Sequence, residues 1–290
     1  MQGHDQAAAL RRMVHGASSP IGPVRSSAIF RKALLIASGK GGVGKTHIST
    51  SLAAVLAERE NRVLLIDADF SLANCHVTLG LRTEWDLSHV FLGLKGIEET
   101  ILRTPWGFDL LPASSGANCV TDVTRDRVER MFDLLQPLAG RYDQILIDAP
   151  AGVSEGVMAL ARSVGRLWVV TTPDPTACTD AYALLKRTSA SEVSARVSVL
   201  VNQTESSSEG TFLGRRLAEV AQHFLGITVT VLGGVPADPI LTRAVRDRRP
   251  VVIHDSLAPS AKAIARLTDF VTGSKSMGNN PTWKRFENHG

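Results

Sequence analysis

A glycine-rich segment at residues 36–46 constrains this chain more than any other feature of its sequence. It reads Ile-Ala-Ser-Gly-Lys-Gly-Gly-Val-Gly-Lys-Thr and contains the spacing G-x-x-x-x-G-K-T. An apolar run at 33–37 precedes it and a helical stretch at 45–60 follows it. Because strand, loop and helix in this order form the setting of a phosphate-binding loop, the segment predicts a nucleotide site.

The residue types of this loop suit a polyphosphate. Glycines let the backbone turn tightly with its N–H groups pointing inward, and the N-terminus of the next helix adds partial positive charge. Lys45 is expected to reach the β- and γ-phosphates, and Thr46 to offer its hydroxyl to Mg²⁺. The alternative is a glycine-rich turn without a ligand, which explains the complete motif less well. The residues expected around the phosphates are Gly39, Lys40, Gly41, Gly42, Val43, Gly44, Lys45, Thr46 and His47.

Lys40 is a second lysine that the general pattern does not require. Lys45 and the loop amides already supply positive charge, so Lys40 could be an ordinary solvated lysine. The segment from Gly39 to Thr46, GKGGVGKT, resembles the deviant phosphate loop of the MinD/ParA branch of P-loop ATPases. In that branch the signature lysine contacts the phosphates bound by the other subunit. The resemblance implies that ATP binding is coupled to formation of a homodimer and that Lys40 and Lys45 take part in catalysis.

Three carboxylates follow apolar runs that are typical of buried parallel strands. Residues 62–67 lead into Asp67-Ala68-Asp69, and residues 144–147 lead into Asp148. Ligands bind at the carboxyl ends of such strands. Asp67 and Asp69 are therefore expected to orient the attacking water and to support the Mg²⁺ shell, and Asp148 to hold Mg²⁺ through water. The resemblance to the MinD/ParA branch implies which does which: Asp69 positions the water, and Asp67 lies nearer the metal. The alternative for the first pair is capping of the strand end.

A short N-terminal segment carries a second resemblance. Residues 5–14 predict a helix, and the Gly, Ser and Pro residues at 16–23 predict a linker. The pattern DQAxxLR resembles the N-terminus of FlhG proteins, also named FleN or YlxH. It implies that an FlhF-like GTPase of the signal-recognition-particle type is bound and activated; the alternative is a helical tail without function. The residues concerned are Asp5, Gln6, Ala7, Leu10 and Arg11.

Further matches to FlhG lie in the second half of the chain. Residues 171–186, TTPDPTACTDAYALLK, resemble the family's TTPEPTSITDAYALIK. Asn202, Pro236 and Asp238 resemble the residues beside the adenine base, although Asn and Asp after strands are often only turn residues. His76 departs from the family pattern. It is expected to be a surface or interface histidine, because phosphoryl transfer depends on positioning and charge rather than an imidazole base.

Strand and helix patterns alternate along the chain, which predicts a doubly wound α/β fold with a mainly parallel sheet and helices on both faces. The expected ATPase domain is 31–273, between an arm at 1–30 and a polar tail at 274–290. A further helix is expected to begin at Asp86. The strands are expected at 33–37, 62–67, 108–111, 144–148, 166–171, 197–202 and 229–235, and the other helices at 45–60, 97–103, 124–138, 176–189, 209–225, 238–246 and 259–271.

Composition limits the partners of the chain. Its net charge is +4, and residues 1–32 hold five basic residues against one acidic residue, so weak or no nucleic-acid binding is expected. No apolar run has the length of a membrane span, which predicts a cytoplasmic protein. Peripheral contact with the inner face of the membrane is left open, since the tail offers only WKRF at 283–286. Three scattered cysteines predict packed thiols rather than disulfides or a metal site: Cys75, Cys119 and Cys178.

The sequence thus predicts an FlhG-type, slow and partner- or dimer-stimulated ATPase that acts as a dimerising switch with ATP and Mg²⁺. The resemblance implies control of flagellar number or placement through the FlhF-like GTPase, flagellar switch (C-ring) proteins and, in some members, a transcription regulator. Two alternatives stay open. One is a MinD- or ParA-type ATPase that positions another cargo, and the other is a nucleotide-gated binding module with negligible hydrolysis.

Overall fold

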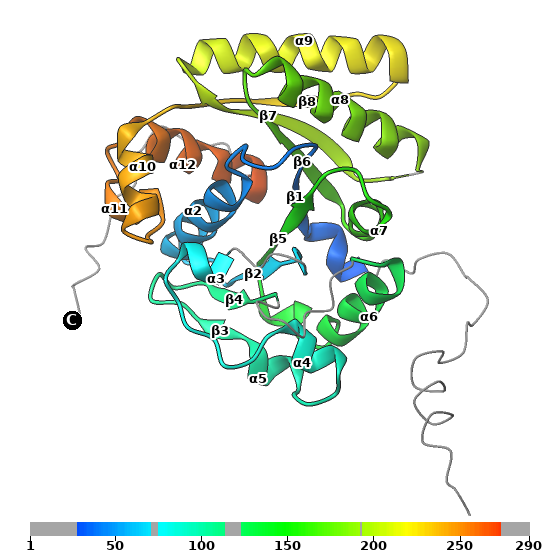
Figure 1. Ribbon diagram of the computed structural model, residues 1–290, viewed down its shortest axis with the longest axis vertical. Helices are drawn as coiled ribbons and strands as arrows, with labels where there is room; N and C mark the ends of the chain where they lie inside the picture. The colour runs from blue at the N-terminus through cyan, green and yellow to red at the C-terminus, as the bar shows by residue number, and fades with distance from the viewer. Residues whose placement is uncertain (1–27, 71–74, 114–122, 192, 274–290) are drawn as a thin grey trace, which may run out of the picture.

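The structure is a computed structural model that describes residues 28–70, 75–113, 123–191 and 193–273 (Figure 1). The predicted activating arm, with Asp5, Gln6, Ala7, Leu10 and Arg11, lies outside the described residues, as do the polar tail and Cys119. Among the helices of the described residues, none combines the length and the apolar character needed to cross a membrane.

Within the described residues, the strands form one eight-stranded sheet in the order β3-β4-β2-β5-β1-β6-β7-β8. Every neighbouring pair is parallel except β3 and β4, so the predicted mainly parallel sheet is confirmed. The strand that leads into the phosphate loop, β1, lies between β5 and β6 near the middle. In sheet order the strands are Leu102–Arg103, Asp109–Leu111, Val63–Asp67, Gln144–Ala151, Leu34–Ser38, Arg166–Thr171, Arg196–Thr204 and Thr230–Pro236.

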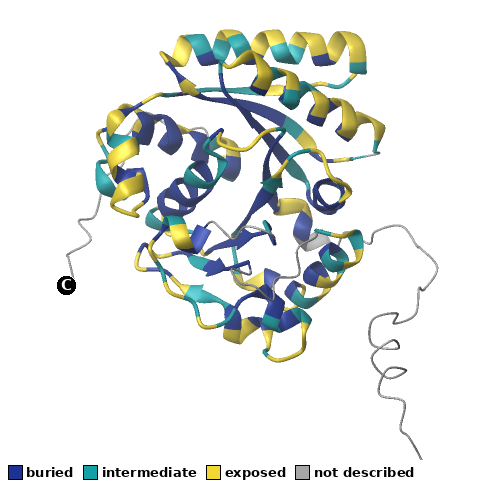
Figure 2. Ribbon diagram, in the orientation of Figure 1, coloured by how far each residue is buried: buried dark blue, intermediate teal, exposed yellow. Residues whose placement is uncertain are grey.

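Helices cover both faces of this sheet, as predicted. Alternate side chains of β1 enter opposite cores: Leu35 and Ala37 join one apolar cluster, and Leu34 and Ile36 join the other. Figure 2 shows the strands mainly in dark blue, with exposed residues gathered on the outermost helices. One face is covered by α6 (Arg125–Leu135), α7 (Glu155–Ser163), α8 (Pro175–Ala190) and α9 (Ser207–Leu225). The other is covered by α2 (Lys45–Glu58), α3 (Cys75–Thr78), α10 (Pro239–Arg246), α11 (Val251–His254) and α12 (Pro259–Thr272).

The segment between β2 and α6 departs from the prediction. The helix expected at 97–103 is wrong in its second half, because α5 (Ile97–Thr100) ends and β3 begins at Leu102. β3 pairs antiparallel with β4, so the backbone groups of this segment form bonds to the sheet instead of a further helical turn. The helix expected from Asp86 is present as α4 (Leu87–Phe91), with Asp86 as its N-cap. Two short 3₁₀ helices complete the described fold, η1 (Ala28–Lys32) and η2 (Ala139–Arg141).

Candidate functional site

The phosphate loop connects β1 to α2 at the carboxyl edge of the sheet. Gly42 and Gly44 have φ of 79° and 84°, in the left-handed region that favours glycine. A Cβ on Gly44 would also lie 2.3 Å from the Asn202 side-chain nitrogen. The loop therefore turns tightly at two glycines that no larger residue could replace without strain. Such a turn at a helix N-terminus forms the concavity of backbone N–H groups that binds anions.

Gly39, at the start of the loop, packs directly against α8. A Cβ at this position would lie 2.1 Å from the backbone oxygen of Asp180, closer than any real contact. No atom of the residues that the structure describes lies within 4 Å of the equivalent point on Gly41. The first glycine of the motif is thus required by the neighbouring helix, and its role is to bring the loop and α8 together.

Asp148, in β5, is the common hydrogen-bond acceptor for three polar side chains of α2. Its two carboxylate oxygens accept hydrogen bonds from Lys45 Nζ at 3.1 Å, Thr46 Oγ1 at 2.7 Å and Ser49 Oγ at 3.0 Å. The structure thus brings together Lys45, Thr46 and Asp148, three of the predicted site residues. Ser49 was not singled out in the sequence. Its signal is its position one helical turn after Lys45, whose backbone oxygen it also contacts at 3.0 Å.

Burial and charge set the protonation of the lysine and histidine on α2. Burial alone would lower the pKa of Lys45, but the charge of Asp148 and its hydrogen bond raise the pKa above the ordinary lysine value. Lys45 is therefore a fixed cation at the end of the phosphate loop. The pKa of the His47 imidazole is lowered instead, because burial lowers it and the charge of Asp148 offsets this effect only in part.

Asp67 forms hydrogen bonds with the backbone that follows β2. It is fully buried, and its oxygens accept hydrogen bonds from the backbone nitrogens of Asp69 at 3.1 Å and Cys75 at 2.9 Å. Capping of the strand end, the alternative considered for this pair, is thus one role of Asp67. Asp69 is half-buried beside it. Its role in orienting water stays a prediction, as does contact of Asp67 with the metal.

Two residues of α3, Cys75 and His76, are buried. Cys75 is the packed thiol that was expected, and its sulfur lies 3.6 Å from Asp148 Oδ2. Burial, with the nearby charges of Asp67 and Asp148, raises the pKa of this thiol. The predicted surface or interface position of His76 is wrong: the side chain is 5 % exposed, because this short helix turns it into the protein. Burial lowers the pKa of His76, which favours the neutral ring.

The donor atoms around Asp148 fit Mg²⁺. Carboxylate and hydroxyl oxygens are the ligands that this ion prefers, and Thr46 Oγ1 lies 2.7 Å from an Asp148 oxygen. Within the described part of the chain, no group of three or more His, Cys, Asp and Glu side chains could hold an ion. Mg²⁺ at this place would therefore take most of its ligands from a nucleotide and from water, as is usual for this ion.

Lys40 contacts its own chain. Its side chain is 46 % exposed, and Nζ donates a hydrogen bond to Thr176 Oγ1 at 2.6 Å and lies 3.7 Å from Asp174 Oδ1. Asp174 is the N-cap of α8 and accepts from the backbone nitrogen of Ala177 at 2.9 Å. Hydrogen bonds from Thr176 and Ala177, with the charge of Lys40, hold the pKa of Asp174 below its usual range.

The residues predicted beside the base lie at the carboxyl ends of β7 and β8. Asn202 is 1 % exposed, and its Nδ2 donates to the backbone oxygen of Val43 at 2.7 Å. Its Oδ1 is buried and has no hydrogen-bond partner among the described residues, which leaves an acceptor for a ligand donor. Pro236 ends β8. Asp238 joins two helices, because its carboxylate accepts from the backbone nitrogens of Ile240 at 2.9 Å and Ser260 at 3.1 Å. Base contact by these residues stays a prediction.

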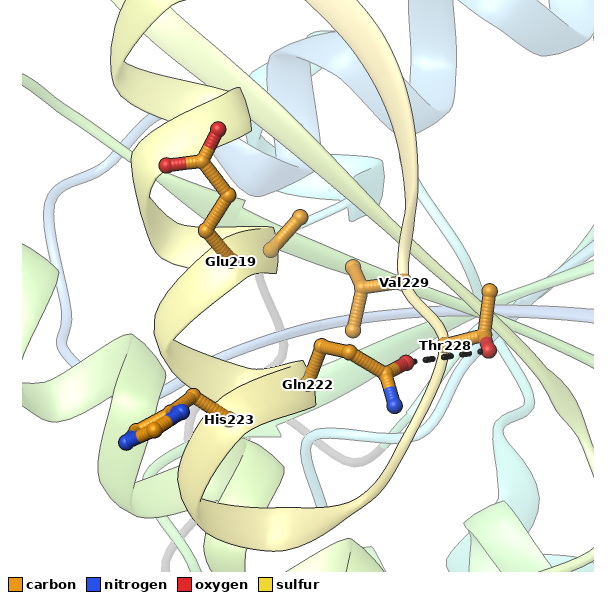
Figure 3. A pocket seen from close by; sticks show the side chains of 6 residues that line it. Glu219, Gln222, His223, Thr228 and Val229 are labelled. Atoms are coloured by element: carbon orange, nitrogen blue, oxygen red, sulfur yellow. Dashed lines mark hydrogen bonds between the residues drawn. The ribbon is translucent and has the colours of Figure 1, made fainter.

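A separate hollow lies between α9 and the segment before β8 (Figure 3). Its volume is about 440 Å³, and Thr228 Oγ1 donates a hydrogen bond to Gln222 Oε1 at 3.2 Å across one side. The residues that line it are Ala218, Glu219, Gln222, His223, Thr228 and Val229. Because this hollow precedes β8, it lies toward the amino ends of the parallel strands. The phosphate loop is at their carboxyl ends, so the hollow is not part of the candidate nucleotide site.

Comparison with known proteins agrees with this geometry. Residues 34–251 match the CobQ/CobB/MinD/ParA nucleotide binding domain. The chain is 33% identical over 239 residues to the antiactivator FleN of Pseudomonas aeruginosa, covering 81% of this chain and 85% of that protein. It is 31% identical over 240 residues to the flagellum site-determining protein YlxH of Helicobacter pylori, covering 81% of each.

A solved relative carries the ligand class that the site predicts. The septum site-determining protein MinD of Pyrococcus horikoshii, complexed with Mg-ADP, superposes with a TM-score of 0.68 at 26% identity. The match covers 82% of this chain and 95% of that one. The phosphate loop, the Asp148 cluster and the surrounding sheet therefore form a nucleotide-binding unit of a known kind.

Proposed function

Because this chain belongs to the MinD/ParA family of nucleotide-binding domains, in the branch that contains FleN and YlxH, we propose that it is a dimerising ATPase that regulates flagellar number or placement. The observation that carries the proposal is the complete phosphate loop, with Lys40 at its start, in a chain that is 33% identical to FleN. ATP is the proposed substrate, and water the acceptor of its γ-phosphoryl group.

The role that we propose for each side chain follows from its contacts. Lys45 and the loop N–H groups bind the phosphates, and Lys45 is already held as a cation by Asp148. Thr46 and Asp148, with Asp67 nearby, hold Mg²⁺, which neutralises phosphate charge when it is bound. Asp69 orients the attacking water. Hydrolysis in such a site depends on positioning and electrostatics, for which the buried Asp148 cluster is suited.

Lys40 serves the dimer in this proposal. Its side chain is exposed and its ion pair with Asp174 lies on the surface, so the lysine can leave it at little cost and reach the phosphates of a partner subunit. Gly41 and Gly42 beside it are also exposed, which lets a second subunit approach the loop. ATP binding thereby sets the oligomeric state, and the dimer is the form in which slow hydrolysis is stimulated.

The output of the switch rests on the names of the relatives and on the resemblance of the N-terminal segment to FlhG. We infer that residues 1–30 form a partner-activating arm, 31–273 the ATPase domain and 274–290 a polar tail. Gln6 and its neighbours stimulate an FlhF-like GTPase, and the ATP-bound dimer engages flagellar switch proteins or a transcription regulator. The protein works in the cytoplasm, and any contact with the membrane is peripheral.

Single-turnover ATP hydrolysis and light scattering test the switch. Lys40→Ala should retain ATP binding but lose ATP-dependent dimers and stimulated hydrolysis, whereas Lys186→Ala, at an exposed lysine of α8, should behave as wild type. Dimers that persist in Lys40→Ala would refute the role of Lys40.

The role of the arm is tested in the full chain. Gln6→Ala should abolish stimulation of GTP hydrolysis by the FlhF-like partner while ATP turnover is unchanged. Full stimulation by that variant would refute the role of the arm.

A further inference from the structure

Gln203 has an unusual backbone for its place in the sheet. It lies in β7 between Asn202 and Thr204, yet its φ is 58°, in the left-handed region that side chains other than glycine rarely adopt. The pairing with β8 shifts at the same point, since Asn202 is opposite Val235 and Thr204 is opposite Pro236. β7 therefore bulges at Gln203. Bulges beside functional sites often serve to redirect a side chain.

The redirected side chain contacts the phosphate loop. Gln203 Nε2 donates a hydrogen bond to the backbone oxygen of Gly42 at 3.3 Å. Its neighbour Asn202 donates from Nδ2 to the backbone oxygen of Val43 at 2.7 Å. A carbonyl oxygen can only accept, so in both cases the amide nitrogen faces the loop. Two successive amides of β7 thus hold two successive carbonyls of the loop.

This arrangement fixes the direction of the groups that would bind phosphate. In a planar trans peptide, the C=O of one residue and the N–H of the next point in opposite directions. Holding the Gly42 carbonyl toward β7 therefore turns the N–H of Val43 away from β7, and holding the Val43 carbonyl does the same for the N–H of Gly44. Because Gly42 is an exposed left-handed glycine, its peptide group would otherwise be free to rotate.

We propose that Gln203 is a positioning residue for phosphate binding, which orients the N–H of Val43 through its bond to the Gly42 carbonyl. This inference rests on the proposed function, because it assigns a role to Gln203 in the same nucleotide site. It explains why β7 keeps a strained, non-glycine residue at the bulge. A glycine would adopt this backbone freely but would have no amide to reach the loop.

Isothermal titration of the full chain with ADP and with adenosine tests the inference. The affinity ratio of these two ligands measures the part of binding that depends on phosphate. Gln203→Ala and Gln203→Gly both lose the amide, but only Gly relieves the backbone strain. Both variants should therefore lower the ADP-to-adenosine ratio by about 3- to 10-fold, the effect of one neutral hydrogen bond, with adenosine affinity unchanged. Gln222→Ala, which removes an exposed glutamine amide on α9, should leave the ratio unchanged.

The outcomes separate this role from the proposed function. A wild-type ratio in both variants would refute the role of Gln203, and so would an equal loss of ADP and adenosine binding, which reports general damage. A loss in Gln203→Ala that is absent in Gln203→Gly would assign the effect to backbone strain and would also refute the proposal. If the wild-type protein binds ADP no better than adenosine, the proposed nucleotide function itself is wrong, and the role of Gln203 falls with it.

Discussion

Removing the carboxylate of Asp148 should destabilise the nucleotide-free protein strongly. The ion pair of Lys45 and Asp148 spans 3.1 Å, and its side chains are 10% and 2% exposed. Asp148→Ala leaves the Lys45 ammonium buried without its partner and also removes the acceptor for Thr46 and Ser49. Breaking a buried pair from one side costs about 3–5 kcal/mol. We expect a loss of that size in the free energy of unfolding.

A surface ion pair provides the matched control. Arg62 and Asp143 are 2.7 Å apart, but their side chains are 63% and 41% exposed. Exposed pairs contribute little because water and salt screen them. Asp143 accepts from the side chain of Arg62 and from its backbone nitrogen at 2.9 Å, but these contacts are exposed, so Asp143→Ala should lose clearly less stability than Asp148→Ala. Both variants replace an aspartate by alanine in an ion pair, and they differ in burial. Urea unfolding at pH 7 without nucleotide measures both.

A second substitution tests the cause of the loss. Lys45→Met removes the buried charge that Asp148→Ala leaves unpaired, so the double variant should be more stable than Asp148→Ala alone. The coupling free energy of this cycle should be about 1 kcal/mol or more. The reasoning is refuted if Asp148→Ala and Asp143→Ala lose the same stability, or if the double variant is less stable than Asp148→Ala.

Two further predictions concern the first half of the phosphate loop. Asp174→Asn keeps an N-cap on α8 but removes the charge beside Lys40, so Lys40 is freer to reach a partner subunit. The dissociation constant of the ATP-dependent dimer, measured by sedimentation, should fall by up to about fivefold. An unchanged or weaker dimer would contradict this. Gly39→Ala should lower the free energy of unfolding by about 1–3 kcal/mol, because the new Cβ would meet the backbone of Asp180. In Gly41→Ala the new Cβ meets none of the described residues, so the free energy of unfolding should change by less than about 1 kcal/mol. Equal losses in urea unfolding would show that packing against α8 is not the cause.

The local part of the site could be predicted because its geometry is encoded in contiguous residues. The motif from Gly39 to Thr46 specifies a strand, a turn at glycines and a helix, and an apolar run ending in Asp148 specifies a neighbouring strand end. Placed in a parallel sheet, these two segments must meet at one edge. Lys45, Thr46 and Asp148 were therefore brought together as expected.

Contacts between distant segments could not be predicted in the same way. The hydrogen bond from Gln203 to Gly42 depends on a bulge in β7, and no residue pattern near position 203 indicates this bulge. Chemistry alone predicts a surface or interface position for His76, but the short helix α3 buries it. The strand at Leu102 was missed because it exists only through its pairing with β4. In each case tertiary contacts decide what the local sequence leaves open.

The phosphate loop is held from three directions before any nucleotide binds. Gly39 packs against α8, the carbonyls of Gly42 and Val43 accept bonds from β7, and Lys45 pairs with Asp148 in β5. Preorganised N–H groups and a fixed cation reduce the ordering that phosphate binding requires. Lys40 differs, because its contacts with α8 are exposed. We therefore expect the loop backbone to keep its shape when nucleotide binds, while Lys45, Thr46 and Asp148 exchange their mutual bonds for phosphate and Mg²⁺. Lys40 exchanges Asp174 for a second subunit, which its exposed position allows.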